Sequence, residues 1–179
     1  MMRRLQNMTL AVALTVLALP VMASNAPKGD IADQVRHELV MLPYYSVFDN
    51  LEYSVQPDGT AVLSGEVRMP ILKSDAGNVV KKVPGVTRVV NNIKVLPLSP
   101  FDNRLRAAEY RSIFGYGSLY RYAMGSNPSI HIIVDNGHVT LKGVVGSLAD
   151  RQLANIRANA VPGVFSVTND LRIAEKGQS

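Results

Sequence analysis

The sequence predicts an α+β protein made of two tandem α-β-β-α-β units. The tetrapeptide Val-Pro-Gly-Val occurs at residues 83–86 and again, unchanged, at residues 161–164, 78 positions later. The segments 65–95 and 143–173 align around it without a gap. In both copies a hairpin pattern with period two is followed by a helical pattern and then by another extended segment. Because two copies are too few for a solenoid, we expect two small domains that pack together.

The repeated tetrapeptide predicts a joint between a helix and a strand. Proline disfavours helical backbone at the residue before it, so a helix ends there. Glycine accepts a positive φ, which lets the chain reverse sharply. The β-branched valine that follows favours an extended segment.

The composition excludes several classes of function. The chain has 179 residues, 47% of them hydrophobic, which is enough to bury one core or two small ones. It has no Cys, which excludes disulfides, cysteine zinc sites and a thiol nucleophile. The formal net charge of +5 is spread along the chain and is too weak to indicate nucleic acid as a partner.

Residues 1–23 have the pattern of a secretory signal peptide. Arg3 and Arg4 precede an apolar run at 10–19, and Val-Met-Ala at 21–23 has small residues spaced for cleavage after Ala23. The alternative is an uncleaved anchor, but the run is shorter than the roughly 20 apolar residues that span a bilayer. We therefore expect a periplasmic mature protein with a net charge of +3, peripheral to the membrane rather than transmembrane.

The first unit is predicted to begin with a helix capped by Asp30 and ended by Pro43. Its apolar stripe consists of Ile31, Val35, Leu39 and Leu42. A hairpin follows around Pro57-Asp58-Gly59, with the predicted pairs Val55–Ala61, Tyr53–Leu63 and Leu51–Gly65. A helix after Pro70 and a third strand through Val89, Ile93 and Val95 complete the unit.

The second unit repeats this order after a linker at 98–100. Asp102 is predicted to cap a helix that runs to about Phe114. Asn136-Gly137 is a strong two-residue hairpin turn; its predicted pairs are Val134–Val139 and Ile132–Leu141. Ser147 with Asp150 predicts the cap of a helix running to Val161, and Val167, Leu171 and Ile173 predict the third strand.

These motifs resemble the BON domain. The resemblance is carried by Asn-Gly-His-Val-Thr-Leu-Lys-Gly-Val-Val at 136–145, a helix with Ala154, the joint at 161–164 and Val-Thr-Asn at 167–169, and again by residues 58–91. It implies two domains, 30–97 and 102–174, each a three-stranded sheet packed on two helices. Family members include osmotically induced, stress-response periplasmic proteins and lipoproteins with two such domains. They are associated with envelope integrity and phospholipid binding, although this chain has no Cys to carry a lipid.

Metal and catalytic sites are not predicted. In the expected register His131 faces Lys142 and His138 faces Asp135 on the outward face, about 13 Å apart along the ladder. One ion would need both nitrogens within about 2.1 Å, so we expect solvated histidines without a metal. The sequence has no nucleophile motif and no phosphate-binding loop, which favours a non-enzyme without a cofactor.

The segment 104–124 breaks the symmetry between the copies, because it contains five of the eleven aromatic residues among several arginines. Arginine suits phosphate, and tyrosine suits a boundary between water and an apolar phase. One interpretation is a binding patch for anionic lipid or another partner, formed by Arg104, Arg106, Arg111, Tyr116, Tyr120, Arg121 and Tyr122. The other is that the aromatic residues fill the interface between the domains while the arginines are solvated.

Asn91 and Asn169 fall in phase with inward-facing apolar residues. A buried Asn needs partners, and we expect both to hydrogen-bond free backbone groups of the joint rather than a ligand.

The resulting hypothesis is a non-enzymatic periplasmic binding module that contacts an anionic phospholipid surface or an envelope protein. The alternatives are a protein-interaction or structural module of the envelope that does not bind lipid, and a sensor of a small ligand or ion.

Overall fold

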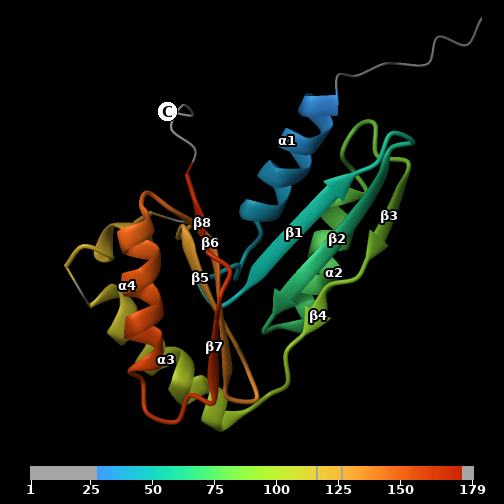
Figure 1. The fold of residues 1–179 in the computed structure, drawn as a ribbon. Helices are drawn as coiled ribbons and strands as arrows, with labels where there is room; N and C mark the ends of the chain where they lie inside the picture. The colour runs from blue at the N-terminus through green and yellow to red at the C-terminus, as the bar shows by residue number, and fades with distance from the viewer. Residues whose placement is uncertain (1–27, 116, 126, 175–179) are drawn as a thin grey trace, which may run out of the picture.

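The computed structural model describes residues 28–115, 117–125 and 127–174 (Figure 1), so the predicted signal peptide at 1–23 lies outside them. The chain forms two units with the same α+β topology, as predicted. Unit 1 consists of α1 (Lys28–Val40), β1 (Asn50–Val55), β2 (Thr60–Val67), α2 (Pro70–Val80), β3 (Arg88–Asn91) and β4 (Lys94–Val95). Unit 2 consists of α3 (Pro100–Phe114), the 3₁₀ helix η1 (Tyr120–Ala123), β5 (Ile130–Asp135), β6 (His138–Val145), α4 (Leu148–Asn159), β7 (Ser166–Asn169) and β8 (Arg172–Ile173).

Each sheet is built around the second strand of its hairpin. In unit 1, β1 is antiparallel to β2, while β3 and β4 are both parallel to β2, as the two halves of one interrupted third strand. In unit 2, β5, β6, β7 and β8 repeat this arrangement. The register of both hairpins is the predicted one. It pairs Val55 with Ala61, Tyr53 with Leu63, Leu51 with Gly65, Val134 with Val139 and Ile132 with Leu141.

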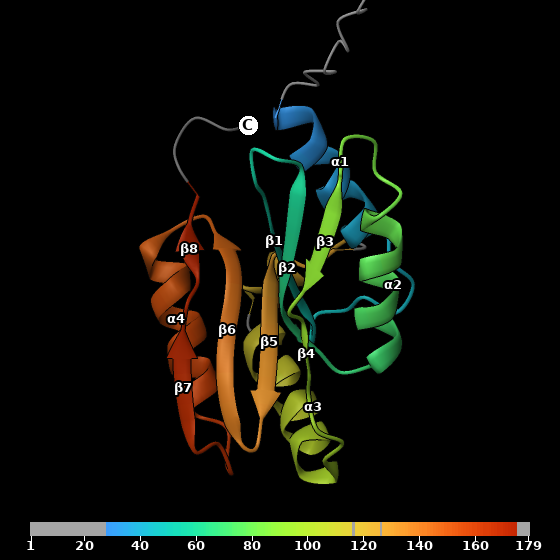
Figure 2. The ribbon, with the colours of Figure 1, turned by 90° about the vertical axis from the view of Figure 1, so that its right-hand side faces the viewer.

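The helices of each unit cover one face of its sheet, because the apolar residues of each strand alternate toward that face. In unit 1, Val35 and Leu39 of α1 and Leu72 of α2 pack with Leu63 of β2. Unit 2 has a separate core around Leu141. Figure 2 views the sheet of unit 2 from its helix-free face, with α3 and α4 behind it. In Figure 1 this helix-free face is turned toward unit 1.

The Val-Pro-Gly-Val joints have the predicted geometry. Gly85 and Gly163 have φ of +90° and +93°, a region that glycine enters without steric cost. Val83 and Val161 are buried immediately before the turns. Each joint therefore ends a helix and anchors it to the core of its own unit.

Two predicted helix caps are wrong. Helix α1 begins at Lys28, so Asp30 lies inside its first turn. Helix α3 begins at Pro100, whose fixed φ suits the first helical position, and Ser99 is its cap, accepting a hydrogen bond from the Asp102 backbone N. The predicted cap of α4 is confirmed, since Ser147 Oγ accepts from the Asp150 backbone N at 3.1 Å.

Asp102 instead holds the hairpin turn of unit 2. Its two carboxylate oxygens accept hydrogen bonds from the backbone N of Asn136 at 3.0 Å and of Gly137 at 2.9 Å. Asp102 is fully buried. The first turn of α3 is thereby tied to the turn between β5 and β6.

Asn91 and Asn169 bond backbone groups, but not those of the joint. Asn91 Nδ2 donates to Lys73 O of α2 at 2.7 Å, and its Oδ1 accepts from Ile93 N at 3.2 Å. Asn169 makes the same pair of contacts with Arg151 O and Leu171 N. Each Asn therefore links a helix to the point where the third strand is interrupted, which satisfies backbone groups left free by the break.

The loop between α1 and β1 joins the two units. Val47 O accepts a hydrogen bond from Ile132 N on the edge of β5 at 2.7 Å. Its side chain is buried in the core of unit 2, and Phe48 packs against that core. Asp49, fully buried, accepts from Arg68 N at 2.7 Å and from Ser46 Oγ at 2.6 Å. The loop is thus hydrogen-bonded to unit 1, while its Val47 side chain completes the core of unit 2.

Candidate functional site

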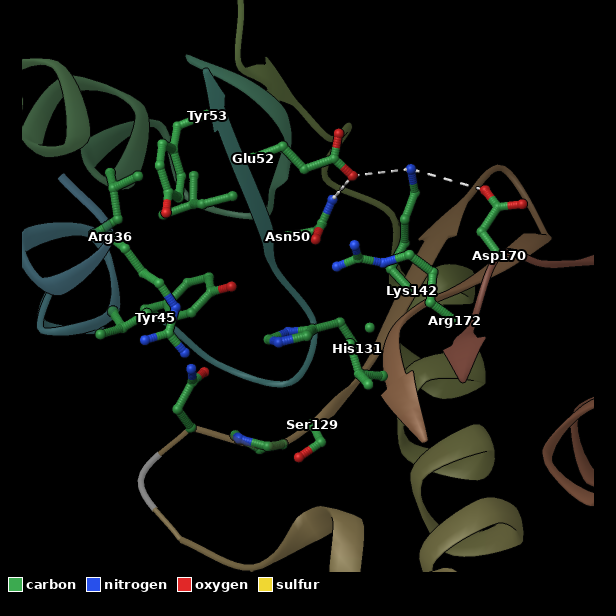
Figure 3. A pocket seen from close by; sticks show the side chains of 17 residues that line it. Arg36, Tyr45, Asn50, Glu52, Tyr53, Ser129, His131, Lys142, Asp170 and Arg172 are labelled. Carbon is green, nitrogen blue, oxygen red and sulfur yellow. Dashed lines mark hydrogen bonds and ion pairs between the residues drawn. The ribbon is translucent and has the colours of Figure 1, made fainter. Parts of the chain in front are cut away.

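A cavity of about 810 Å³ lies between the two units, and we call it the interunit cleft (Figure 3). One wall comes from α1 and β1 of unit 1, and the other from β5, β6 and β8 of unit 2. Its polar and aromatic lining residues include Arg36, Tyr45, Asn50, Glu52, Tyr53, His131, Lys142, Asp170 and Arg172.

Both carboxylates of the cleft share one ammonium group. Lys142 Nζ lies 3.2 Å from Glu52 Oε1 and 3.8 Å from Asp170 Oδ2. Asn50 Nδ2 also donates to Glu52 Oε1 at 2.9 Å, and this bond does most to lower the pKa of Glu52, with smaller contributions from Lys142 and Arg172. Burial lowers the pKa of Lys142, but its contacts with Glu52 outweigh this and leave that pKa raised.

Two guanidinium groups enter the cleft from opposite units. Arg36 extends from α1 and Arg172 from β8. The Arg172 side chain points toward the space above His131, and the Arg36 side chain runs along the opposite wall beside Tyr45 (Figure 3). Within the described ranges, neither forms a hydrogen bond or an ion pair. The cleft therefore carries two cations whose charges are not already matched by a direct contact.

His131 lies at the floor of the cleft, and its predicted exposure to solvent is wrong. The residue is only 7% exposed, and its ring centroid lies 5.5 Å from that of Tyr45. His131 points to the face of the sheet opposite the helices, as predicted, but the loop of unit 1 covers that face. Burial lowers the pKa of His131, against the opposing effect of nearby backbone carbonyls, and burial raises the pKa of Tyr45 to about 12. His131 Nδ1 has no hydrogen-bond partner in the part of the chain that the structure describes.

His138 is exposed, as predicted, and hydrogen-bonds Ser166 Oγ through Nδ1 at 2.7 Å. His131 pairs with Lys142 and His138 with Asp135, in the predicted register. Within residues 28–115, 117–125 and 127–174, no group of three or more His, Cys, Asp or Glu side chains could hold a metal ion.

The arginines and tyrosines predicted as a binding patch do not form one surface. Arg106 is buried and donates to Asn103 Oδ1 at 2.8 Å and to Val134 O at 2.5 Å. Tyr122 is also buried, and Tyr116 lies outside the described residues. The side chains of Arg104, Arg111, Tyr120 and Arg121 are exposed, so a binding role for these four stays a prediction.

Arg121 is exposed but already paired. Its Nη2 lies 2.7 Å from Asp150 Oδ2 and 2.9 Å from the Tyr122 hydroxyl. That hydroxyl donates to Asp150 at 3.0 Å and accepts from Gly146 N at 2.8 Å. The network fastens η1 to the start of α4, which leaves Arg104 and Arg111 as the less constrained cations of the predicted set.

Among the described residues of this segment, Tyr110 has the interface position that the second interpretation expects. The ring of Tyr110 lies 6.2 Å from that of Phe48, which belongs to the loop of unit 1, and 5.0 Å from that of Phe114. Tyr122 packs in the core of unit 2 instead.

An exposed group of rings at one end of unit 2 was missed in the sequence. The centroids of Phe101 and Phe165 are 6.0 Å apart in a stacked arrangement. Arg104 Cζ lies 5.9 Å from the Phe101 ring, and the His138 ring 5.9 Å from that of Phe165. We call these four residues the aromatic surface. One signal was available, since Phe165 follows the second joint at the position that Thr87 occupies after the first.

The comparison with family models matches the BON domain at residues 27–97 and 121–175. The two segments together span more than half of the chain, and the protein belongs to the BON-domain family. The second match begins at Arg121, so it leaves out α3 with Arg104 and Arg111.

Seven chains of solved structures are similar to this chain. One is the C-terminal domain of CdsD, a structural protein of the type III secretion system of Chlamydia trachomatis, with 14% identity and a TM-score of 0.32 over 82% of this chain and 98% of that one. A second CdsD structure has 15% identity and a TM-score of 0.31 over 83% and 95%. Similarity at this level carries no functional argument.

No protein among the curated sequences matches this chain. Helices that could cross a bilayer are also not found among the described residues, since none of them is both long and apolar enough.

Proposed function

We propose that this protein is a non-enzymatic periplasmic module that docks on anionic phospholipid through the aromatic surface of unit 2. The observation that carries the proposal is the stacked pair Phe101 and Phe165, with Arg104 beside it. Phe165 is 69% exposed. Such large exposed rings are typical of a surface that meets an apolar or interfacial phase.

The chemistry of the aromatic surface suits the boundary of a bilayer. Aromatic rings enter the headgroup region, while arginine binds phosphate through its planar fork of donors. Arg111 is seven residues after Arg104 on α3, which places it on the same side of the helix. Each cation close to an anionic membrane adds about 1 kcal/mol of attraction, so these two arginines favour anionic over neutral lipid.

The periplasmic location rests on the sequence pattern at residues 1–23 and on membership of the BON family. The family is also the basis for proposing a binding module rather than an enzyme. Support of envelope integrity would then follow from attachment of the module to the inner or outer membrane.

Vesicle co-sedimentation of the chain from residue 24 onward tests the proposal. We expect binding to vesicles that contain phosphatidylglycerol, weak binding to neutral phosphatidylcholine vesicles, and about a tenfold loss for the double variant F101S/F165S. The matched control is Ile156→Ser, which removes an apolar side chain, 63% exposed, from α4. Equal failure with both kinds of vesicle, or an equal loss in the control, would refute docking through this surface.

A protein partner in the envelope is the second candidate. It is favoured by β1 and β7, which end the strand order of their sheets with no strand paired on their outer edge within the described ranges. Such edges accept an added strand. Crosslinking in cells from a photoreactive residue at Ser54 would recover one defined protein, while vesicle binding would be absent.

A further inference from the structure

We propose that the interunit cleft binds a small polar molecule through a carboxylate or phosphate group held between Arg36 of unit 1 and Arg172 of unit 2. This site is separate from the aromatic surface, and its ligand is a soluble anion rather than a membrane.

The cleft has the size of a ligand site. Its volume of about 810 Å³ falls within the roughly 300–1,000 Å³ of typical small-molecule sites. Tyr45 and Tyr53 add aromatic surface to one wall, and Leu39, Val40 and Val144 add apolar surface. A ligand of several carbon atoms with polar substituents would therefore meet both apolar and hydrogen-bonding groups.

The pairing of charges selects an anion. Lys142 contacts both Glu52 and Asp170, and the charge of Arg172 also stabilises the Glu52 carboxylate. Counting Arg36 as well, three cations face two carboxylates, and within the described part of the chain neither arginine makes a hydrogen bond or an ion pair. Guanidinium groups bind carboxylates and phosphates through paired, charge-assisted hydrogen bonds. An oxyanion between the two arginines would give each of them an opposite charge without competing with the pairs that Lys142 already makes.

His131 lies at the floor of the cleft, where its ring can report on a bound ligand. Its side chain points into the cavity (Figure 3), it is 7% exposed, and its Nδ1 lacks a partner among the described residues. Because Nδ1 itself is shielded from the cleft, a ligand would meet the other atoms of the ring, and the ring would sense its charge.

Because the two arginines come from different units, a bound ligand would connect them. A ligand that binds only the folded protein raises its free energy of unfolding. The increase grows with the logarithm of the ratio of ligand concentration to dissociation constant. Binding would therefore raise the midpoint of thermal unfolding as well as perturb the cleft.

The experiment is a titration of the mature chain with inorganic phosphate and, separately, with succinate, at constant ionic strength. Histidine ring resonances in NMR spectra provide the readout. We expect saturable shifts of the His131 resonances in the wild type, and at least a tenfold weaker binding in Arg36→Gln and in Arg172→Gln. Arg36→Gln removes no direct contact within the described residues, so this variant should unfold at the midpoint of the ligand-free wild type. Arg172→Gln also removes an attraction for Glu52, so its midpoint should be slightly lower.

Two control variants separate this proposal from others. Arg88→Gln removes an exposed charge from β3, outside the cleft, and should leave the titration unchanged. Arg104→Gln should weaken vesicle binding but not phosphate binding, so the two proposals can fail independently. Absence of saturation, or equal weakening in Arg88→Gln, would overturn the cleft proposal. The cleft proposal would also be overturned if the His131 resonances responded to phosphatidylglycerol vesicles in a way that depends on Arg36, but responded to neither phosphate nor succinate.

Discussion

Units 1 and 2 have the same order of elements but differ in the connection between the first helix and the first strand. In unit 1 this connection lies at 41–49, and it places Val47 in the core of unit 2. In unit 2 it lies at 115–129 and contains η1, whose Tyr122 packs, with Leu119, into the core of its own unit. Because of this difference, the connection of unit 1 inserts a side chain into the core of unit 2, whereas the connection of unit 2 packs into the core of its own unit. A duplicated sequence has thus produced an asymmetric pair, in which unit 1 completes the core of unit 2.

The copies also differ in how they bury charge. Unit 1 buries Asp49, which accepts hydrogen bonds from a hydroxyl and a backbone N–H and forms an ion pair with the Arg68 guanidinium at 4.0 Å. Unit 2 buries Glu109, and neither of its carboxylate oxygens has a partner among the described residues. Burial raises the pKa of Glu109 to about 8. Unit 2 is therefore expected to be the half of the molecule that responds to pH.

The largest expected effect comes from removing the contact between Val47 and the core of unit 2. Val47→Asp would place a charge in the core of unit 2 at the edge of β5, and we expect a loss of roughly 4 kcal/mol in the free energy of unfolding. Urea denaturation measures this loss. The matched control is Met41→Asp, at the start of the same connection, where the side chain is 67% exposed. Equal losses in the two variants would show that Val47 does not contribute to the core of unit 2.

The next effect concerns Glu109 and depends on pH. Because the pKa of Glu109 in the folded state is raised from 4.5 to about 8, its protonated form contributes stability that is complete below pH 4.5 and is lost as the pH rises toward 8. With about 1.4 kcal/mol per pKa unit, Glu109→Gln should be about 3 kcal/mol more stable than the wild type at pH 7. At pH 4 the two should be nearly equal.

Urea denaturation at pH 4, 5.5, 7 and 8 measures this difference. The control is Glu38→Gln on α1, which removes a carboxylate from unit 1 and leaves Glu109 in place. Parallel pH curves for the wild type and Glu109→Gln would contradict a raised pKa for Glu109.

The smallest effect compares the two hairpin turns. In unit 2, Asp102→Ala would leave the backbone N of Asn136 and of Gly137 without their acceptor, at a cost of about 2 kcal/mol. In unit 1, Asp58 is exposed and accepts a hydrogen bond from Thr60 N at 2.9 Å, so Asp58→Ala should cost clearly less than Asp102→Ala. Hydrogen exchange of the two turns measures the difference. Equal protection in the two variants would mean that Asp102 does not hold the turn.

The hairpins, joints and helix order could be predicted because their causes lie within a few residues. Period-two patterns and turn residues determined the pairing of Tyr53 with Leu63 and of Ile132 with Leu141. The same reasoning failed at Asp30 and Asp102, because a helix can begin at several neighbouring residues and Pro100 moved one start upstream.

The candidate sites were harder to predict, since they join residues that are far apart in the chain. Arg36, His131 and Arg172 have no local pattern in common, and only the packing of unit 1 against unit 2 brings them to one cleft. The clustering of Arg and Tyr at 104–124 could not distinguish the exposed Arg104 from the buried Arg106, because both occur in the same helix.

By itself the sequence determined the duplication, the α+β topology and the register of both hairpins, because backbone preferences and side-chain alternation act locally. The tertiary structure decided which residues are covered. His131 occupies the outward face that its strand position requires, yet the loop around Val47 buries it. Burial depends on what packs against a face, and here that partner lies more than eighty residues earlier in the chain.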